Sequence, residues 1–528
     1  MSTFTATIKE QYYRTPTRNI VFILFLVALF LRVIYPDLKL LHHDEAIHAW
    51  MSYVLLTSGT YTYDPTYHGP LLYYIMSTVF SIFGDNDAVS RLVPGIVGAL
   101  IIPALYPLYK FDYVSKNQTV LVALFFTLSP NMVYFSRFLR HDIFQLLFTL
   151  LLLVCIFAYI ERNKWYFALL AGICGGLALC LKEEVPAVLF LFTSFFIAMW
   201  LLGKIEFPKT WSRDIVITVF SALAICFIFY SSLLTQPDVF FEAANRALDH
   251  WLAMHGECRL CGPPYFYFFF LILYELPILI LGAVAVFTWL LRKEGLLRIV
   301  KAGTDYVNGV IDRHEFKVPY HPFDKKELFF ILCLYWLVGT MSLYGYVGEK
   351  VPWLLIHQLF PLLFVSVSIL EDLNRKNVIK IGICVAWLII LMVHVTFIPV
   401  ADLSEPIVQV QNSEDLRIIM ALIDASERPA LISAHTWPLP WYYRGERWGK
   451  FLYYDSPIPE DELYALDADL IIADYSDSIY PSLEGYTKET YRLSYWFSWY
   501  ENGKRALAWF FLRDGVLGSL NTNVFTRA

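Results

Sequence analysis

Long apolar runs alternate with short polar segments along most of this chain. About eleven of the runs are long enough to form helices that cross a bilayer, which takes roughly 20 apolar residues. These runs cover residues 20–35, 93–109, 118–135, 143–160, 166–181, 185–202, 215–234, 268–291, 328–345, 354–370 and 378–398. The pattern predicts a polytopic α-helical membrane protein.

One further apolar run, residues 70–83, is short and is closely flanked by polar residues. We interpret it as a helix that lies in the membrane interface. With this run outside the membrane, one set of loops holds 21 Lys and Arg, and the opposite set, without the C-terminal tail, holds eight. The positive-inside rule then predicts a cytoplasmic N-terminus, and the odd number of spans places residues 399–528 outside the cell membrane.

The pattern changes after the last apolar run, so we expect a membrane-embedded domain over residues 1–398 and a soluble domain over 399–528. Leu431–Ala434, Leu470–Ala473 and Ala506–Leu512 are strand-like runs between polar helical stretches, which predicts a small α/β domain. Four aromatic residues of this tail either stack on sugar rings or pack against the membrane domain and headgroups, namely Trp437, Trp441, Tyr442 and Tyr443.

Composition agrees with a membrane protein and excludes one class of partner. The chain is 57% hydrophobic and 17% charged, whereas ordinary globular chains carry about a quarter charged residues. The net charge of −6 comes without a basic patch, so we expect no nucleic acid partner. No small-residue cleavage site follows residues 20–35, so this run is expected to be a span and not a cleavable signal.

Residues capable of chemistry gather in the expected outer loops. They are His43, Asp44, Glu45 and His68 in the first loop, Arg91 at the start of the second span, Arg137, Arg140 and Asp142 in the second loop, and Lys182, Glu349 and Lys350 farther along. Charges at the membrane edge are costly unless they are paired or face water, although they also anchor helix ends by snorkelling. A carboxylate can deprotonate a hydroxyl, and Arg and Lys can hold a phosphate. The set suits transfer of a group from a lipid phosphate to an acceptor hydroxyl.

The motifs in these loops resemble those of membrane glycosyltransferases of the GT-C fold, in particular the protein O-mannosyltransferases and the lipid A aminoarabinose transferases. The resemblance rests on Asp44-Glu45, on His68-Gly69-Pro70-Leu71, on Arg91 and on Asp142. Gly69 stands where the mannosyltransferases have Pro.

A closer resemblance covers nearly the whole chain and is to the archaeal family of flippase-activity-associated proteins, which belongs to the same superfamily. Its motifs here are His43-Asp44-Glu45-Ala46, Tyr63-Asp64-Pro65 through His68-Gly69-Pro70, Ser136-Arg137-Phe138 through Asp142, Glu349-Lys350 with Pro352-Trp353, Tyr274-Glu275-Leu276-Pro277, and residues 437–442.

The resemblance implies transfer of a sugar from a polyprenyl (dolichyl) phosphate donor to a lipid-linked glycan or surface glycoprotein. Asp44 is then the base, and Glu45 and His43 orient the acceptor or the base. Arg91, Arg137, Arg140 and Lys350 hold the lipid phosphate and Asp142 fixes the Arg side chains, with His68, Lys182 and Glu349 in support. The alternative is a non-enzymatic flippase, or its accessory, whose basic residues grip the headgroup during crossing.

A metal has two candidate places. His250, His255, Cys258 and Cys261 have spacing that suits zinc, a Cys258–Cys261 disulfide, or residues with no link at all. The outer carboxylates could bind a divalent ion, as they do in oligosaccharyltransferases of this fold. Because the basic residues already supply positive charge, we expect no required cofactor.

Overall fold

The computed structural model describes residues 10–257, 262–292, 294–313, 320–398, 402–476 and 479–528. The chain divides into two compact units. The first consists of Met1–Ile34, Thr60–Ile75 and Leu92–Thr396, and the second of Tyr35–Gly59, Met76–Arg91 and Phe397–Ala528. The second unit therefore contains the tail together with two segments that the sequence assigned to the membrane domain.

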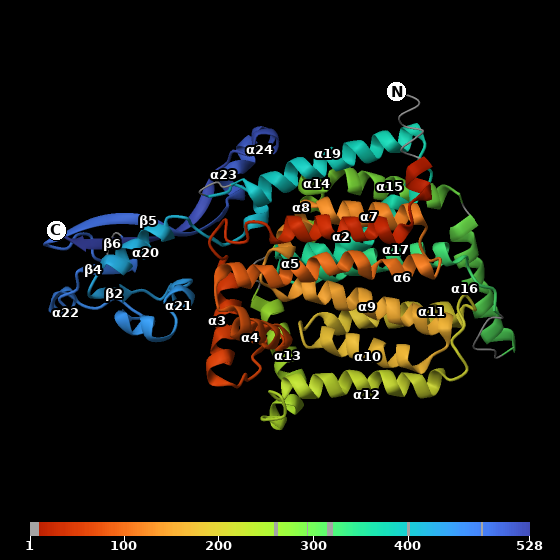
Figure 1. The fold of residues 1–528 in the computed structure, drawn as a ribbon, viewed down its shortest axis with the longest axis horizontal. Coiled ribbons are helices and arrows are strands. Elements are labelled where there is room, and N and C mark those ends of the chain that lie inside the picture. The colour runs from red at the N-terminus through yellow and green to blue at the C-terminus, as the bar shows by residue number, and fades with distance from the viewer. Residues whose placement is uncertain (1–9, 258–261, 293, 314–319, 399–401, 477–478) are drawn as a thin grey trace. The chain divides into compact units, whose positions relative to one another are not determined.

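Among the described residues, six helical stretches are long and apolar enough to cross a membrane. They are Asp87–Lys110 (α5 Asp87–Ala104 with α6 Tyr106–Lys110), α9 His141–Arg162, α12 Trp211–Tyr230, α17 Lys325–Tyr346, Pro352–Leu370 (α18 Ile356–Val367 with its flanking 3₁₀ turns) and α19 Arg375–Phe397. Two bent helix pairs pass the same test, namely α7 Lys116–Leu128 with α8 Pro130–Ser136, and α14 Phe266–Tyr274 with α15 Leu276–Leu291. The helices α9, α10 and α12 run side by side (Figure 1).

Three shorter helices coincide with the remaining expected spans: the apolar helices α10 Trp165–Leu179 and α11 Val185–Leu201, and α2 Thr17–Val33. Each of the eleven expected runs therefore coincides with a helix or a helix pair, and the prediction of a polytopic helical membrane protein is confirmed. Residues 70–83 form α4, Leu71–Phe83, whose 13 residues extend only about 20 Å and cannot cross a core of about 30 Å.

Two of the expected straight spans are broken. The α7–α8 pair bends by 63° and the α14–α15 pair by 114°. Ser129 precedes Pro130 and has an extended ψ of 126°, because a residue before proline is pushed out of the helical region. Pro277 stands in the first turn of α15, where its missing N–H costs nothing. Apolar run length alone does not reveal such breaks.

The two breaks are joined to each other by one buried carboxylate. The Ser129 hydroxyl donates to Glu275 Oε1 at 2.5 Å, and the Asn131 side-chain amide donates to the same oxygen at 3.0 Å. Glu275 is fully buried. The Asn131 backbone N–H, which lacks a helical acceptor after the break, donates to the same oxygen at 3.3 Å.

The polar segments between spans carry further helices. These are α3 His43–Ser58 after the first span, α13 Pro237–Glu257 between α12 and α14, and α16 Glu294–Arg313 between α15 and α17.

The C-terminal part of the second unit contains one six-stranded sheet. Its strands are β1 Gln411–Asn412, β2 Pro429–Ile432, β3 Leu452–Tyr454, β4 Leu470–Asp474, β5 Tyr486–Phe497 and β6 Leu517–Arg527, in the order β1-β5-β6-β4-β2-β3. Strand β2 pairs in parallel with β3 and β4, and the remaining pairs are antiparallel. The short helices are α20 Leu416–Ala425, α21 Leu439–Tyr442, α22 Glu460–Ala465, α23 Trp499–Asn502 and α24 Ala506–Leu512.

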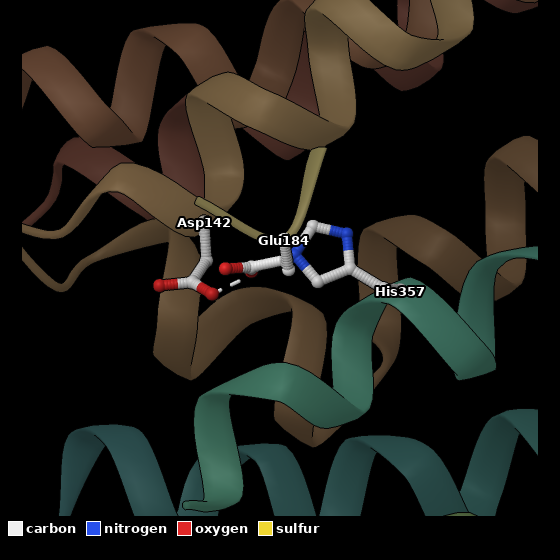
Figure 2. A group of neighbouring side chains, drawn as sticks. All are labelled: Asp142, Glu184 and His357. Atoms are coloured by element: carbon white, nitrogen blue, oxygen red, sulfur yellow. Dashed lines mark ion pairs between the residues drawn. The ribbon is translucent and has the colours of Figure 1, made fainter. Parts of the chain in front are cut away.

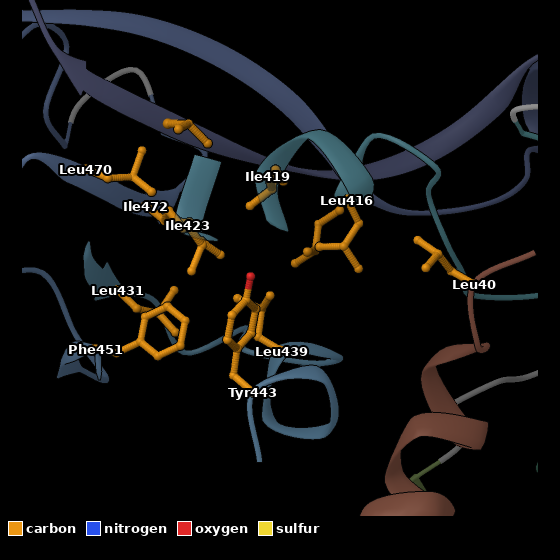
Figure 3. Close-up of a cluster of buried hydrophobic side chains, with 12 residues drawn as sticks. Leu40, Leu416, Ile419, Ile423, Leu431, Leu439, Tyr443, Phe451, Leu470 and Ile472 are labelled. Carbon is orange, nitrogen blue, oxygen red and sulfur yellow. The ribbon is translucent and has the colours of Figure 1, made fainter. Parts of the chain in front are cut away.

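Alternate residues of the strands bury into two cores, as the period of a strand requires. One face carries Leu431, Leu470 and Ile472, and the opposite face carries Ile432 and Ile471. Figure 3 shows that Leu40 of the loop before α3 joins the first of these cores beside Leu416. This loop is therefore part of the same compact unit as the tail.

Two of the three expected strands of the tail are confirmed, as β2 and β4. The third, Ala506–Leu512, is wrong, because these residues form helix α24. A short apolar run cannot distinguish a strand from a helix, and Ala and Leu favour the helix. Only Trp509 of this helix is buried, and Arg513 ends it in the left-handed conformation at φ 56°.

Candidate functional site

The candidate base Asp44 lies in the first turn of α3, where several contacts organise the backbone. His42 caps the helix, because its Nδ1 accepts from the Asp44 backbone N–H at 3.1 Å. The Glu45 carboxylate accepts from the His42 backbone N–H at 2.9 Å, which completes a capping box. The first turn of α3 therefore holds Asp44 at a helix N-terminus.

Glu45 is fully buried and pairs with Arg91 through two parallel bonds. Arg91 Nε donates to Oε1 at 3.0 Å and Nη2 donates to Oε2 at 2.6 Å. The other Arg91 N–H groups donate to the backbone carbonyls of Pro36, Lys39 and Leu40. A guanidinium has five N–H donors, and this arrangement uses them all. Arg91 thus connects Glu45 to the loop before α3, and its expected contact with the phosphate stays a prediction.

His43 and Asp44 remain half-buried, whereas Glu45 beside them is inaccessible. The imidazole of His43 lies edge-on to the Trp437 ring, with centroids 6.5 Å apart. The first turn of α3 therefore presents a carboxylate and an imidazole at a partly exposed surface, with a buried ion pair behind them. Such a carboxylate can take a proton from a hydroxyl that reaches it.

A second group of charged side chains lies in the first compact unit, around the start of α9. Arg140 lies over the Trp353 ring, with its guanidinium carbon 3.9 Å from the ring centroid. Its Nη2 is 3.1 Å from His68 Nε2, and its Nε is 3.6 Å from Asp142 Oδ2. The planar guanidinium is thus held by an aromatic face, an imidazole and a carboxylate, which suits a group that meets phosphate with a fixed orientation.

Lys182 is the second cation of this group. Its Nζ lies 2.9 Å from Asp142 Oδ1 and 3.0 Å from Glu184 Oε1. Burial lowers the pKa of Lys182, but the two carboxylates raise it more, and the net pKa lies above its usual value of 10.5. The lysine is therefore charged in the folded protein.

The same carboxylates are a candidate site for a divalent ion. Figure 2 shows Asp142, Glu184 and His357 turned toward one another, and one ligand atom from each lies within 4.8 Å of the others. The donor types suit a metal. However, the Lys182 ammonium already bridges both carboxylates, so the residues as arranged fit a divalent ion only if Lys182 moves away.

His68 belongs to the same unit through a carboxylate next to Lys182. Its Nδ1 is 2.9 Å from Glu183 Oε2, and the Tyr63 hydroxyl donates to Glu183 Oε1 at 2.9 Å. Burial raises the pKa of Glu183, but the imidazole and the hydrogen bonds lower it more, so the net pKa lies below its usual value. The expected supporting residues His68, Asp142 and Lys182 therefore lie together with Arg140.

Two expected phosphate-binding residues are engaged with backbone carbonyls. Lys350 Nζ donates to the carbonyls of Tyr344, Gly345 and Val347 at the end of α17, which occupies its three donors. Burial lowers the pKa of Lys350. Arg137 Nη1 donates to the carbonyls of Leu31 and Ile34 at the end of α2. Both cations thus stabilise helix C-termini. Glu349 lies half-buried beside Lys350.

The candidate zinc residues are only partly described. His250 lies half-buried in α13. Cys258, Cys261 and the side chain of His255 lie outside the described residues, so the zinc, disulfide and unlinked alternatives stay predictions.

Sequence reasoning missed His357. It lies inside an expected span, 3.5 Å from Asp142, and is buried. The signal was present, because His357 and Gln358 interrupt an apolar run, and polar residues within a span mark functional places.

Comparison with known proteins defines the class. Residues 67–235 match the family model of the dolichyl-phosphate-mannose-protein mannosyltransferases. This range contains His68, Arg91, Arg137, Arg140, Asp142 and Lys182. No curated protein matches by sequence.

One solved structure indicates the fold, and a second is reported with it. The oligosaccharyltransferase of Archaeoglobus fulgidus in the apo form has 13% identity and a TM-score of 0.53, and the match covers 87% of this chain and 69% of that one. ArnT from Cupriavidus metallidurans bound to undecaprenyl phosphate has 14% identity and a TM-score of 0.45, covering 69% of this chain. The present chain spans 62% of that ArnT.

The protein is thus a multi-pass membrane protein with the GT-C fold. Within this superfamily it resembles the dolichyl-phosphate-mannose-protein mannosyltransferases over residues 67–235. The narrower assignment to the archaeal flippase-associated family stays a prediction, as do the orientation of the termini and the role of each site residue.

Proposed function

We propose that the protein is a glycosyltransferase that moves a sugar from a polyprenyl (dolichyl) phosphate donor to a hydroxyl of a lipid-linked glycan or surface glycoprotein on the outer face. The observation that carries the proposal is the state of Asp44. Its carboxylate is half-buried at a helix N-terminus, and a buried Glu45–Arg91 pair holds the turn that carries it. The match of residues 67–235 supports the donor class.

In the proposed reaction, the acceptor hydroxyl gives its proton to Asp44 while its oxygen forms a bond to the anomeric carbon of the sugar. The bond from that carbon to the phosphate oxygen breaks, and the lipid phosphate leaves with the bonding electron pair. Because the nucleophile enters opposite the leaving group, the anomeric configuration inverts. In this proposal His43, one residue before Asp44, orients the acceptor.

In this proposal, Arg140 binds the departing phosphate. Its guanidinium plane is held against Trp353, and Asp142 and His68 restrain its orientation. Arg and phosphate form two parallel charge-assisted bonds, which a fixed guanidinium forms at lower entropic cost. Lys182 also pairs with Asp142. This carboxylate is therefore shared between two cations and does not cancel the charge of Arg140 by itself.

The test is a transfer assay with purified protein in lipid nanodiscs, radiolabelled dolichyl-phosphate sugars and acceptors extracted from cells. Asp44→Asn is expected to lower turnover about 100-fold or more, because it removes the base and keeps the shape. Asp37→Asn is the matched control, since Asp37 is exposed in the same loop. Transfer at the wild-type rate by folded Asp44→Asn would contradict the proposal and favour a flippase or accessory.

A further inference from the structure

The loop that follows β2 begins at a special point of the sheet. Strand β2 has β3 on one side and β4 on the other, and all three run in parallel. The chain leaves β2, adds β3 on one side, and then crosses to add β4 on the other. The carboxyl end of β2 is therefore a topological switch point, where open α/β sheets bind their ligands.

Polar side chains that can bind a ligand meet at the carboxyl end of β2. Asp474, the last residue of β4, accepts hydrogen bonds from the Ser433 hydroxyl and from the Ala434 backbone N–H. His435 Nδ1 is 3.2 Å from the same carboxylate. Because Nδ1 is turned to Asp474 and the His435 side chain is 57% exposed, Nε2 is the ring nitrogen presented to solvent.

The same loop reaches the helix that carries the candidate base. The Trp437 ring is half-buried, with its centroid 6.5 Å from that of His43 and 5.8 Å from that of Trp50, both in α3. His43 immediately precedes Asp44. A partly exposed aromatic face therefore lies within the same compact unit as Asp44 and next to its neighbour.

The other three aromatic residues of this segment have structural roles. Trp441 is fully buried and donates to Asp87 at 2.8 Å, and the Tyr442 hydroxyl donates to the same carboxylate at 2.9 Å. The Tyr443 hydroxyl donates to Asp424 at 3.0 Å and its ring is buried. Trp437 and Tyr442 are the partly accessible residues of the four considered for sugar stacking, and Tyr442 is held by Asp87 and packs against the core of the tail.

We propose that Ser433–Trp437 forms the acceptor subsite and that it binds a glycan, with one sugar ring on Trp437 and hydroxyls bonded to His435. Sugar recognition requires an apolar aromatic face and a few fixed polar groups, and the loop supplies both over a reach of roughly 7 Å. The Asp474 contacts hold the loop in place before the ligand binds. This inference rests on the proposed function, because it assigns the acceptor of that reaction.

Binding can be measured without transfer. Full-length protein in nanodiscs is mixed with mannobiose, lactose or chitobiose, and saturation-transfer NMR reports binding. At least one disaccharide is expected to bind the wild type. The signal is expected to fall about tenfold in Trp437→Ala, to survive in part in Trp437→Phe, and to fall in His435→Ala. Trp496→Ala is the control, since Trp496 is an exposed Trp of the same unit.

Thermal unfolding shows whether each variant remains folded, and Trp437→Phe retains an aromatic partner for Trp50. No binding of any disaccharide by the wild type, or equal binding by Trp437→Ala, would overturn the subsite. Binding of an unglycosylated peptide with the same dependence on Trp437 would overturn the glycan assignment.

Transfer kinetics separate this inference from the proposed function. With a transferable acceptor, Trp437→Ala is expected to raise the acceptor KM about tenfold and to leave the donor KM unchanged. A wild type that binds sugars through Trp437 but transfers none would refute the proposed function and leave the subsite standing. A wild type that transfers but shows no Trp437 dependence would refute the subsite alone.

Discussion

Glu45 and Arg91, 46 positions apart, form a two-pronged ion pair in which both side chains are buried. The pair holds the first turn of α3 against the loop before it, because Arg91 also donates to three backbone carbonyls of that loop. Asp44 is the residue next to Glu45, so its backbone position depends on the pair.

Breaking this pair is therefore expected to reduce stability and turnover together. Glu45→Ala leaves the Arg91 charge buried without its partner, which typically costs about 3–5 kcal/mol. Thermal unfolding and kcat are the measurements. Arg91→Lys should also lose stability, because an ammonium cannot reproduce five planar donors. An Arg91→Lys protein with wild-type stability and weakened donor binding would instead show that Arg91 binds the phosphate.

Arg140 and Lys350 are expected to differ in what they control. Arg140→Lys should weaken binding of undecaprenyl phosphate by about 1.5–3 kcal/mol, the value of a hydrogen bond to a charged group. Lys350→Gln should lower the unfolding temperature instead, because its ammonium holds carbonyls at the end of α17. Titration of the lipid into both purified variants distinguishes them. Equal losses of affinity in the two variants would place both residues on the phosphate.

Replacing Lys182 is expected to turn its surroundings into a divalent metal site. Lys182→Met leaves Asp142 and Glu184 without the ammonium between them, which should lower the unfolding temperature. Added Mn²⁺ should restore it, because His357 completes a set of three donors. The wild type and the control Lys164→Met should show no such response. A wild type that loses activity in EDTA and regains it with Mn²⁺ would contradict the bridging role of Lys182.

Glu183 predicts a dependence of stability on pH. Its pKa in the folded protein lies below the usual 4.5, so the unfolded state binds the proton more readily. The stabilisation is therefore present above pH 4.5 and is lost as the pH falls through the folded pKa. Glu183→Gln should unfold at a lower temperature than the wild type at pH 7, and the difference should shrink on acidification. A difference in unfolding temperature that stays constant between pH 7 and pH 3 would show that the stabilisation does not come from the Glu183 carboxylate.

The spans were predictable because each is a long apolar run, and nothing else in a chain of this composition needs such a run. The bends at Ser129 and Glu275 were not, because apolar length is the same on both sides of a break. The seven apolar residues of α24 fit both the strand period and the helix period, so the sequence pattern did not reveal the helix. The packing of Trp509 in the folded protein favours the helix.

For the candidate site, residue types were predictable and partners were not. Asp142, Lys182, His68 and Arg140 were expected to act together, and the structure brings them into one group. Arg91 carries the same charge as Arg140, yet its donors are directed to Glu45 and to carbonyls. The partners of each arginine depend on contacts between distant segments, and sequence spacing does not contain them.

The Glu275 carboxylate also sets an order of events during synthesis. Ser129 is made 146 residues before its partner, and at roughly 5–20 residues per second the ribosome needs on the order of ten seconds to reach Glu275. Throughout that interval the bend between α7 and α8 has been synthesised but lacks the carboxylate that later joins the two breaks. We therefore expect the nascent protein to need the insertion machinery while the polar bend lacks its acceptor, and variants of Glu275 should be removed by quality control before they accumulate in the membrane.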